Sequence, residues 1–367
     1  LGGNDRLATL HLQFDTCNDY VIRAILENKN LSNLSLRCEN LNNDDKKHVG
    51  SVGFSILPDL AYLTQLSLWG FQIDAQECGF IVKCTKLERL TLNNCNLKDE
   101  SLLLLESRMN NLKSLDVSNN LLLTSYSFSH FQNNIQQLDL DNIRLDEKLL
   151  QYLSACSSIK RLSLYGERMT DNNIKLLFDY RLQLEHFQLT GVNMLTNSGF
   201  RFIRDGCPNL KSLSVYIPDT ITIRGIQFLA DLPLTRVELR KATSSIVPGL
   251  HLFFLNQNVI RLDLINCNMD IGAMDCIIRN STLQVLNAKS CHLTPLFLEK
   301  LLQYTTAIRS LSASVDGDVV TIAEKLTLCP TLAELSLTTS LPTKTEKLML
   351  EEQFLQLVPS LHSVSVR

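Results

Sequence analysis

The stretch LERLTLNNCNLKDESLLLL, residues 87–105, decides the fold because two patterns of hydrophobic residues, with different spacing, follow each other in it. Leu90 and Leu92 alternate with polar residues, which is typical of a half-buried strand. From Asp99 onward the leucines follow one another closely, as they do in a short helix. Cys95 lies between the two patterns. The stretch therefore predicts one strand, a turn and one helix.

The same unit recurs along the whole chain of 367 residues. The pattern L-x-x-L-x-L, with apolar substitutions, opens at Leu7, Leu31, Leu63, Leu87, Leu112, Ile135, Ile159, Leu184, Leu210, Leu234, Val259, Leu283, Ile308, Leu332 and Leu361. Most openings are 23–26 residues apart, and the longest interval, after Leu31, is 32 residues. A period of this length predicts about 15 stacked repeats, because one such unit cannot bury its leucines alone.

Stacking of these units predicts an α/β solenoid of the leucine-rich-repeat type. Its strands form a parallel sheet on a concave face, and the wider helices cover the convex face, so the array bends into a curved horseshoe. We expect a single domain over residues 1–367, with atypical terminal repeats and an inserted loop at about 39–54. Helix starts are expected at the capping residues Asp99, Asp146, Thr170 and Thr294, the last followed by Pro295.

The cysteines follow the repeat and form no C-x-x-C pair. Positions in a repeat are counted from the first residue of its L-x-x-L-x-L pattern, which is position 1. Three of the eleven cysteines are at position 9: Cys95, Cys267 and Cys291. Four more lie three residues before the next repeat: Cys84, Cys156, Cys207 and Cys329. Asn120 occupies position 9 in its own repeat, so we expect a small buried side chain there that bonds backbone groups left unpaired by the turn. Structural, reduced thiols of a cytosolic or nuclear protein are expected.

The pattern C-P-x-L-x-x-L-x-L-x-x-C, followed by M-T-D or L-K-D and a helix, resembles the cysteine-containing repeats of F-box proteins of the leucine-rich-repeat type. The likeness is best at residues 84–110, 156–182 and 207–230. In that family an N-terminal F-box binds the Skp1 adaptor of a Skp1–cullin–F-box ubiquitin ligase, and the repeats hold the substrate. The resemblance therefore implies a substrate receptor of the ubiquitin conjugation pathway. This sequence departs from the family because its repeats begin at Leu7 and no F-box is visible.

Charge and motifs argue against several other classes of protein. A net charge of -3 does not favour nucleic acid as the partner, and the apolar runs at 102–105 and 250–255 are far shorter than a membrane span. The seven histidines show no metal-binding spacing, and neither a phosphate-binding loop nor a nucleophile elbow occurs. We expect a chain that is not an enzyme and that needs neither cofactor nor metal.

Function is expected on the exposed strand positions 3, 5, 7 and sometimes 8, since alternation directs positions 4 and 6 into the core. The chain's one tryptophan falls there, together with two tyrosines, an acidic group, a basic group and two residues between them. The aromatic candidates for partner binding are Trp69, Tyr165 and Tyr216. The acidic group is Asp116, Asp139 and Asp141, and the basic group is Arg236, Arg240, Lys241 and Arg261. Arg161 and His186 lie between these two groups. Aromatic residues often anchor protein interfaces, and segregated charge orients a partner. The alternative stays open that these side chains pack on neighbouring strands or are only solvated.

Three functions follow from this face. The first is recognition of a protein or peptide, as the substrate-binding part of a ubiquitin ligase in the cytoplasm or nucleus. The second is a scaffold, a regulatory subunit or a microbial effector that binds a protein in a stable complex. The third is a receptor ectodomain, which would carry glycans at Asn30, Asn33 or Asn280 and paired cysteines. We favour the first, with neither nucleic acid nor membrane as the partner.

Overall fold

The computed structural model describes residues 7–39, 52–129, 134–179, 182–242, 246–250, 252–253, 258–267, 275, 277–278, 281–304, 307–315, 326, 329–338 and 344–366. Its contacts define two compact units: Leu1–Gly166 with Leu176–Leu184, and Glu167–Lys175 with Glu185–Arg367. Most of the expected insertion, residues 40–51, lies outside the described part of the chain, as does Asn280.

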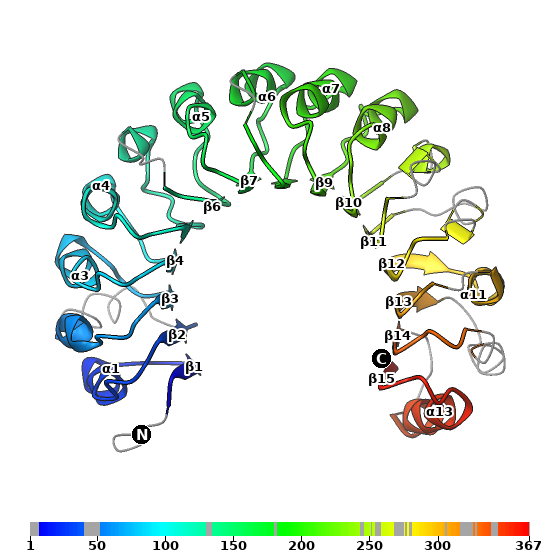
Figure 1. Ribbon diagram of the computed structural model, residues 1–367, viewed down its shortest axis with the longest axis horizontal. Helices are drawn as coiled ribbons and strands as arrows, with labels where there is room; N and C mark the ends of the chain where they lie inside the picture. Colours follow the sequence, from blue (N-terminus) through cyan, green and yellow to red (C-terminus); the bar gives the residue numbers. More distant parts are fainter. Residues whose placement is uncertain are drawn as a thin grey trace. The chain divides into compact units, whose positions relative to one another are not determined.

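The first unit contains strands that pair in parallel and in sequence order. They are β1 (Thr9–Phe14), β2 (Asn33–Cys38), β3 (Gln65–Trp69), β4 (Arg89–Asn93), β5 (Ser114–Asp116), β6 (Gln137–Leu140) and β7 (Arg161–Tyr165). The helices of this unit lie on one side of the sheet (Figure 1). They are α1 (Asp19–Leu26), η1 (Phe54–Asp59), α3 (Ala75–Ile81), α4 (Asp99–Arg108), η2 (Ser125–Phe128) and α5 (Glu147–Ser154). Helix α6 (Asp171–Leu177) has its first residues in the second unit.

The second unit repeats this arrangement. Its strands are β8 (His186–Thr190), β9 (Ser212–Tyr216), β10 (Arg236–Arg240), β11 (Arg261–Ile265), β12 (Val285–Leu293), β13 (Ser310–Val315), β14 (Glu334–Thr338) and β15 (Ser363–Val366). Its described helices are α7 (Asn197–Gly206), α8 (Ile223–Ala230), η3 (Val247–Leu250), α11 (Pro295–Tyr304) and α13 (Lys344–Leu357). The described part of the chain contains fifteen parallel strands, one for each repeat in the sequence, which confirms the α/β solenoid of leucine-rich-repeat type.

The core of each unit is built from the repeated apolar positions. In β4, Leu90 and Leu92 are buried while Arg89 is exposed and Thr91 is half-buried between them. The leucines of neighbouring strands pair in register, as Leu66 does with Leu90, so their side chains stack beneath the sheet. Since helices this short are marginal in water, burial of their apolar face against these leucines is what stabilises them. The inward positions predicted for β4 are therefore confirmed, and so are the outward Arg89 and Thr91, whereas Asn93, at an outward position 7, is buried.

The expected helix of a repeat is a 3-10 helix in η1, η2 and η3. The predicted caps hold at Asp146, whose carboxylate accepts from the Leu149 amide at 2.8 Å, and at Thr170, whose hydroxyl accepts from the Asn173 amide at 3.4 Å. The prediction for Asp99 was wrong, because Lys98 is the N-cap residue with an extended backbone and Asp99 is the first helical residue.

The carboxylate of Asp99 instead serves the next repeat. It accepts from the Thr124 amide at 2.8 Å and from the Thr124 hydroxyl at 2.6 Å, and Thr124 itself caps η2. Asp171 accepts from Thr196 in the same way, and that threonine caps α7. These bonds fix the start of one helix to the start of its neighbour, so the stacking of repeats is stabilised on the helical side as well as in the sheet.

At position 8, in the turn near the end of the strand, eight of the described repeats have a backbone with a positive φ. The described residues with this conformation at that position are Gly70, Asn94, Asn119, Asn142, Gly191, Lys241, Asn266 and Ser290. Glycine and asparagine adopt the left-handed region most readily, which explains why they are frequent here. At Gly70 no side chain would fit, because a Cβ atom would lie 2.2 Å from the carbonyl oxygen of Cys38.

The residue at position 9 bonds the groups that this turn leaves unpaired. Asn120 donates from Nδ2 to the carbonyls of Leu92 and Val117 at 2.7 Å, and its Oδ1 accepts from the amides of Cys95 and Leu97 at 3.0 Å. The thiol of Cys95 donates to the carbonyls of Leu68 and Asn93 at 3.3 and 3.4 Å. The structural role expected for Cys95 is confirmed.

The other described cysteines are also buried, and their sulfurs are thiols and not disulfides. Burial raises the pKa of the Cys84 thiol to about 12 and, with a smaller effect of Glu106, that of Cys156 to about 11. Thiols with such values are protonated at neutral pH and are poor nucleophiles. These side chains therefore contribute to packing and not to chemistry.

Candidate functional site

The twelve candidate residues all lie on or directly after the strands, on positions that the helices do not cover, and none of them is buried. Arg161, Arg236 and Lys241 are exposed and the other nine are half-buried. Within the first unit, the fold brings together the three aspartates. Within the second, it brings together Tyr216 and the four basic residues. Their part in binding stays a prediction.

Trp69 has a partner on the adjacent strand. It pairs in register with Arg37 of β2, and the Arg37 guanidinium carbon lies 4.9 Å from the centre of the indole ring. Arg37 also forms an ion pair with Glu39, with 3.3 Å between Nε and Oε1. The alternative weighed for the aromatic residues, packing against a neighbouring strand, thus applies to one face of Trp69.

An open depression of about 280 Å³ lies beside this pair, at the ends of β2, β3 and β4. Arg37, Cys38, Glu39, Trp69, Gly70 and Asn94 line it. The lining offers guanidinium and amide donors, one carboxylate and an aromatic ring. It could therefore hold a polar side chain of a partner.

The acidic group is a hydrogen-bonded network on β5, β6 and β7. The Ser118 hydroxyl donates to Asp139 at 2.6 Å, and the Ser118 amide donates to Asp116 at 2.9 Å. The hydroxyl of Ser163 donates to Asp141 at 2.9 Å. Burial, with the charge of Asp139 as a smaller cause, raises the pKa of Asp116, while the bonds from Ser118 oppose the rise.

The basic group of β10 and β11 is paired with two acids, Glu238 and Asp263, that are not among the twelve candidate residues. Arg261 binds Asp263 through two hydrogen bonds, at 2.7 and 3.0 Å. Arg240 binds Glu238, with Nε and Nη2 at 2.8 and 2.6 Å from Oε1. The missed signal is the i, i+2 spacing in RLD at 261–263 and ELR at 238–240, because such residues share one face of a strand.

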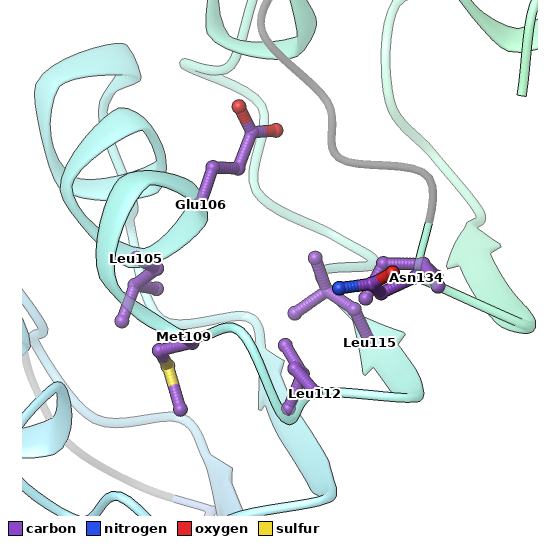
Figure 2. A pocket seen from close by; sticks show the side chains of 7 residues that line it. Leu105, Glu106, Met109, Leu112, Leu115 and Asn134 are labelled. Atoms are coloured by element: carbon purple, nitrogen blue, oxygen red, sulfur yellow. The ribbon is translucent and has the colours of Figure 1, made fainter.

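A second, smaller cavity of the first unit lies between α4 and β5 and is lined by a buried carboxylate. Leu105, Glu106, Met109, Leu112, Leu115, Asn134 and Ile135 line this cavity of about 20 Å³. Figure 2 shows the Glu106 carboxylate directed away from Met109 and Leu112. No described residue donates to its oxygens, and burial raises the pKa of Glu106 to about 8. The cavity has room for about one water molecule and for no larger ligand.

The described residues offer little for other chemistry. No cluster of three or more His, Cys, Asp or Glu side chains among them could hold a metal ion. In the same part of the chain, no helix combines the length and the apolar character that a bilayer span needs.

A parallel sheet with one strand per repeat, backed by helices, defines the fold of leucine-rich-repeat proteins. No protein-family model and no curated protein matches the chain.

Solved structures do match. A chain from the crystal structure of the Rad7 and Elc1 complex of yeast has 18% identity, a TM-score of 0.58, and coverage of 82% of this chain and 80% of that chain. An internalin, InlF, of Listeria monocytogenes is 15% identical with a TM-score of 0.41, and the match covers 98% of this chain and 87% of the internalin chain. A leucine-rich-repeat protein of Leptospira interrogans is 16% identical with a TM-score of 0.45, and the match covers 98% of this chain and 96% of the Leptospira chain.

Proposed function

We propose that this chain recognises a protein partner through the exposed face of its parallel sheet, and that it acts as a binding subunit and not as an enzyme. The observation that carries the proposal is the placement of the aromatic and charged candidates on that face, with none of them buried. Half-buried aromatic residues and arginines held by carboxylates lose little side-chain entropy on binding, which favours an interface.

The test begins with affinity purification of the chain and identification of any partner present in stoichiometric amount. The complex is then reconstituted from purified components, and hydrogen exchange of the free and bound chain is compared. We expect added protection in the strands, with the helix surfaces unchanged. Protection confined to the helices, or the lack of any stoichiometric partner, would contradict the proposal.

Crosslinking gives an independent measurement of the same face. A photoreactive phenylalanine analogue is placed at Thr91 of β4 or Ser312 of β13, which are half-buried strand positions. Gln76 of α3 and Gln303 of α11, both exposed on helices, provide matched controls. We expect crosslinks to the reconstituted partner from one or both strand positions and from neither helix position.

Within this function, we favour the substrate receptor of a Skp1–cullin–F-box ubiquitin ligase. Two observations support it: the resemblance of the cysteine-containing repeats at 84–110, 156–182 and 207–230, and the likeness of the fold to a chain from the Rad7 and Elc1 complex. Co-purification of the full-length protein with Skp1 is the expected result. A stable complex without Skp1 would favour the scaffold or regulatory subunit instead.

A further inference from the structure

The exposed face of β9 to β12 in the second unit carries a dense group of cations. Arg236 of β10 and Arg261 of β11 are register partners, so their side chains start from neighbouring strands at the same level. Arg240 and Lys241 follow on β10 and at its end, and the exposed Lys289 follows on β12, where it pairs with Ile265. These five residues, the basic face below, lie on three adjacent strands, β10 to β12.

The acids beneath the basic face are far less exposed than the cations. The side chain of Asp263 is 3% exposed and that of Glu238 is 17%, whereas Arg261, Arg240 and Arg236 are 38%, 41% and 50% exposed. The carboxylates therefore lie at the level of the sheet, and the guanidinium groups lie above them in contact with solvent. A partner approaching this face meets positive charge first.

The buried acids also fix the positions of the arginines. Asp263 accepts from Nε and Nη2 of Arg261, lies 3.9 Å from Nε of Arg236, and accepts from Nδ2 of Asn287 at 3.2 Å. Glu238 holds Arg240 through Nε and Nη2. Because a guanidinium has five N–H donors, each of Arg240 and Arg261 retains donors for a second carboxylate.

Lys241 extends the basic face at the end of β10. Its backbone lies in the left-handed region, with φ of 58°, at the position where several other repeats carry asparagine or glycine. Its Nζ atom lies 5.5 Å from the centre of the Tyr216 ring on the neighbouring strand. Tyr216 and, to a smaller extent, Asp219 raise the pKa of Lys241, so the ammonium group stays charged.

We infer that the basic face binds an acidic segment of the protein partner, with aspartate or glutamate carboxylates of that segment paired to Arg240, Arg261 and Arg236. The inference rests on the proposed function and adds the chemistry of the ligand. Among the described residues of β9 to β12 and the turns that follow them, five cations meet three carboxylates, Glu238, Asp263 and Asp219, which leaves two positive charges to be matched. Guanidinium groups already oriented by buried acids bind a carboxylate with less loss of rotamer freedom than free arginines would.

A short fluorescein-labelled peptide rich in glutamate provides the probe, with its glutamine analogue as the uncharged control. We expect fluorescence anisotropy to detect binding of the glutamate peptide alone, weakening as salt is added. Arg240→Gln with Lys241→Gln should raise its Kd about tenfold or more, equivalent to about 1.4 kcal/mol. Arg224→Gln with Lys300→Gln removes the same charge from exposed positions on α8 and α11 and should leave Kd unchanged within about twofold.

The Asp263→Asn variant distinguishes two explanations of peptide binding: pairing with oriented arginines, and general attraction to positive charge. The change makes the face more positive but removes the carboxylate that holds Arg261. If orientation matters, Kd should rise about threefold, whereas simple electrostatic attraction would lower it. Circular dichroism and the melting temperature show that each variant is folded before its Kd is compared.

Several results would overturn the inference. They are equal loss of binding in the two double variants, tighter binding by Asp263→Asn, or binding of a phosphoserine peptide or an oligonucleotide in place of the glutamate peptide. The reconstituted partner then separates the two proposals. A partner that protects the strands yet binds Arg240→Gln with Lys241→Gln as tightly as the unaltered chain refutes the acidic-segment inference and leaves the proposed function intact.

Discussion

Arg261 donates two hydrogen bonds to Asp263, two residues further along the same strand, at 2.7 Å from Nε to Oδ2 and 3.0 Å from Nη2 to Oδ1. Asp263 is almost completely buried, and it also accepts from Asn287 of the next strand. A buried carboxylate is costly unless its oxygens are satisfied, so these donors are what allow an acid in the sheet. The pair thus links the stability of β11 to the orientation of an exposed cation.

We expect Asp263→Ala to destabilise the second unit by about 1 to 3 kcal/mol, because the donors of Asn287 and Arg261 lose their acceptor. The half-exposed guanidinium of Arg261 can be hydrated again, which keeps the loss below that of a fully buried pair. Urea unfolding followed by circular dichroism measures the change. Glu334→Gln, at an exposed position of β14, is the control and should shift the free energy of unfolding by less than about 0.5 kcal/mol.

Asn120→Ala should cost more stability than Cys95→Ala, although both residues occupy position 9 of a repeat. The amide of Asn120 satisfies two backbone amides and at least two carbonyls, so we expect a loss of about 3 kcal/mol, against about 1 kcal/mol for the weaker thiol bonds of Cys95. Denaturant midpoints of the two variants provide the comparison. Equal losses would mean that side-chain volume, and not hydrogen bonding, determines which residues fit this position.

Glu106→Gln should stabilise the first unit, and by more at alkaline than at acidic pH. Burial raises the pKa of Glu106 from 4.5 to about 8, so the folded state binds the proton more tightly than the unfolded state does. The unaltered protein therefore loses stability as pH rises from about 4.5 to about 8. The loss in free energy of unfolding is about 1 to 3 kcal/mol at neutral pH. The glutamine variant has no titrating group at this position and does not show this loss.

Melting curves of the Glu106→Gln variant and the unaltered chain across this pH range measure the difference. Glu100→Gln, exposed on the same helix α4, is the matched control. A gap in melting temperature that stays constant with pH would show that Glu106 does not titrate in this range.

Leu92→Ala should destabilise the first unit by about 2 to 5 kcal/mol, since it empties a fully buried aliphatic site. Thr91→Ala, one residue earlier on the other face of β4, should cost less than about 1 kcal/mol. Equilibrium unfolding of both variants tests the alternation directly. Comparable losses would contradict the assignment of the sheet face as a surface available to a partner.

Much of the fold could be predicted because its signal is local and repeated. The two-residue alternation around Leu90 and Leu92 depends only on strand geometry, and the recurrence of that pattern left one way to bury the leucines. The hydrogen-bond partner of the Asp99 carboxylate could not be predicted from such a local pattern. That carboxylate bonds Thr124 in the following repeat, a choice that depends on how two helices lie beside each other.

The sequence by itself determined the period, the parallel strands, the buried leucine columns and the role of position 9, because each follows from backbone geometry applied once per repeat. Only the tertiary structure decided which polar side chains meet across repeats, as in Asn287 with Asp263 and Arg37 with Trp69, and which carboxylates are buried, as in Glu106. The reason is physical. Burial and hydrogen bonding of a polar side chain depend on neighbours that lie a whole repeat away in the chain, and the charge that a partner meets depends on both.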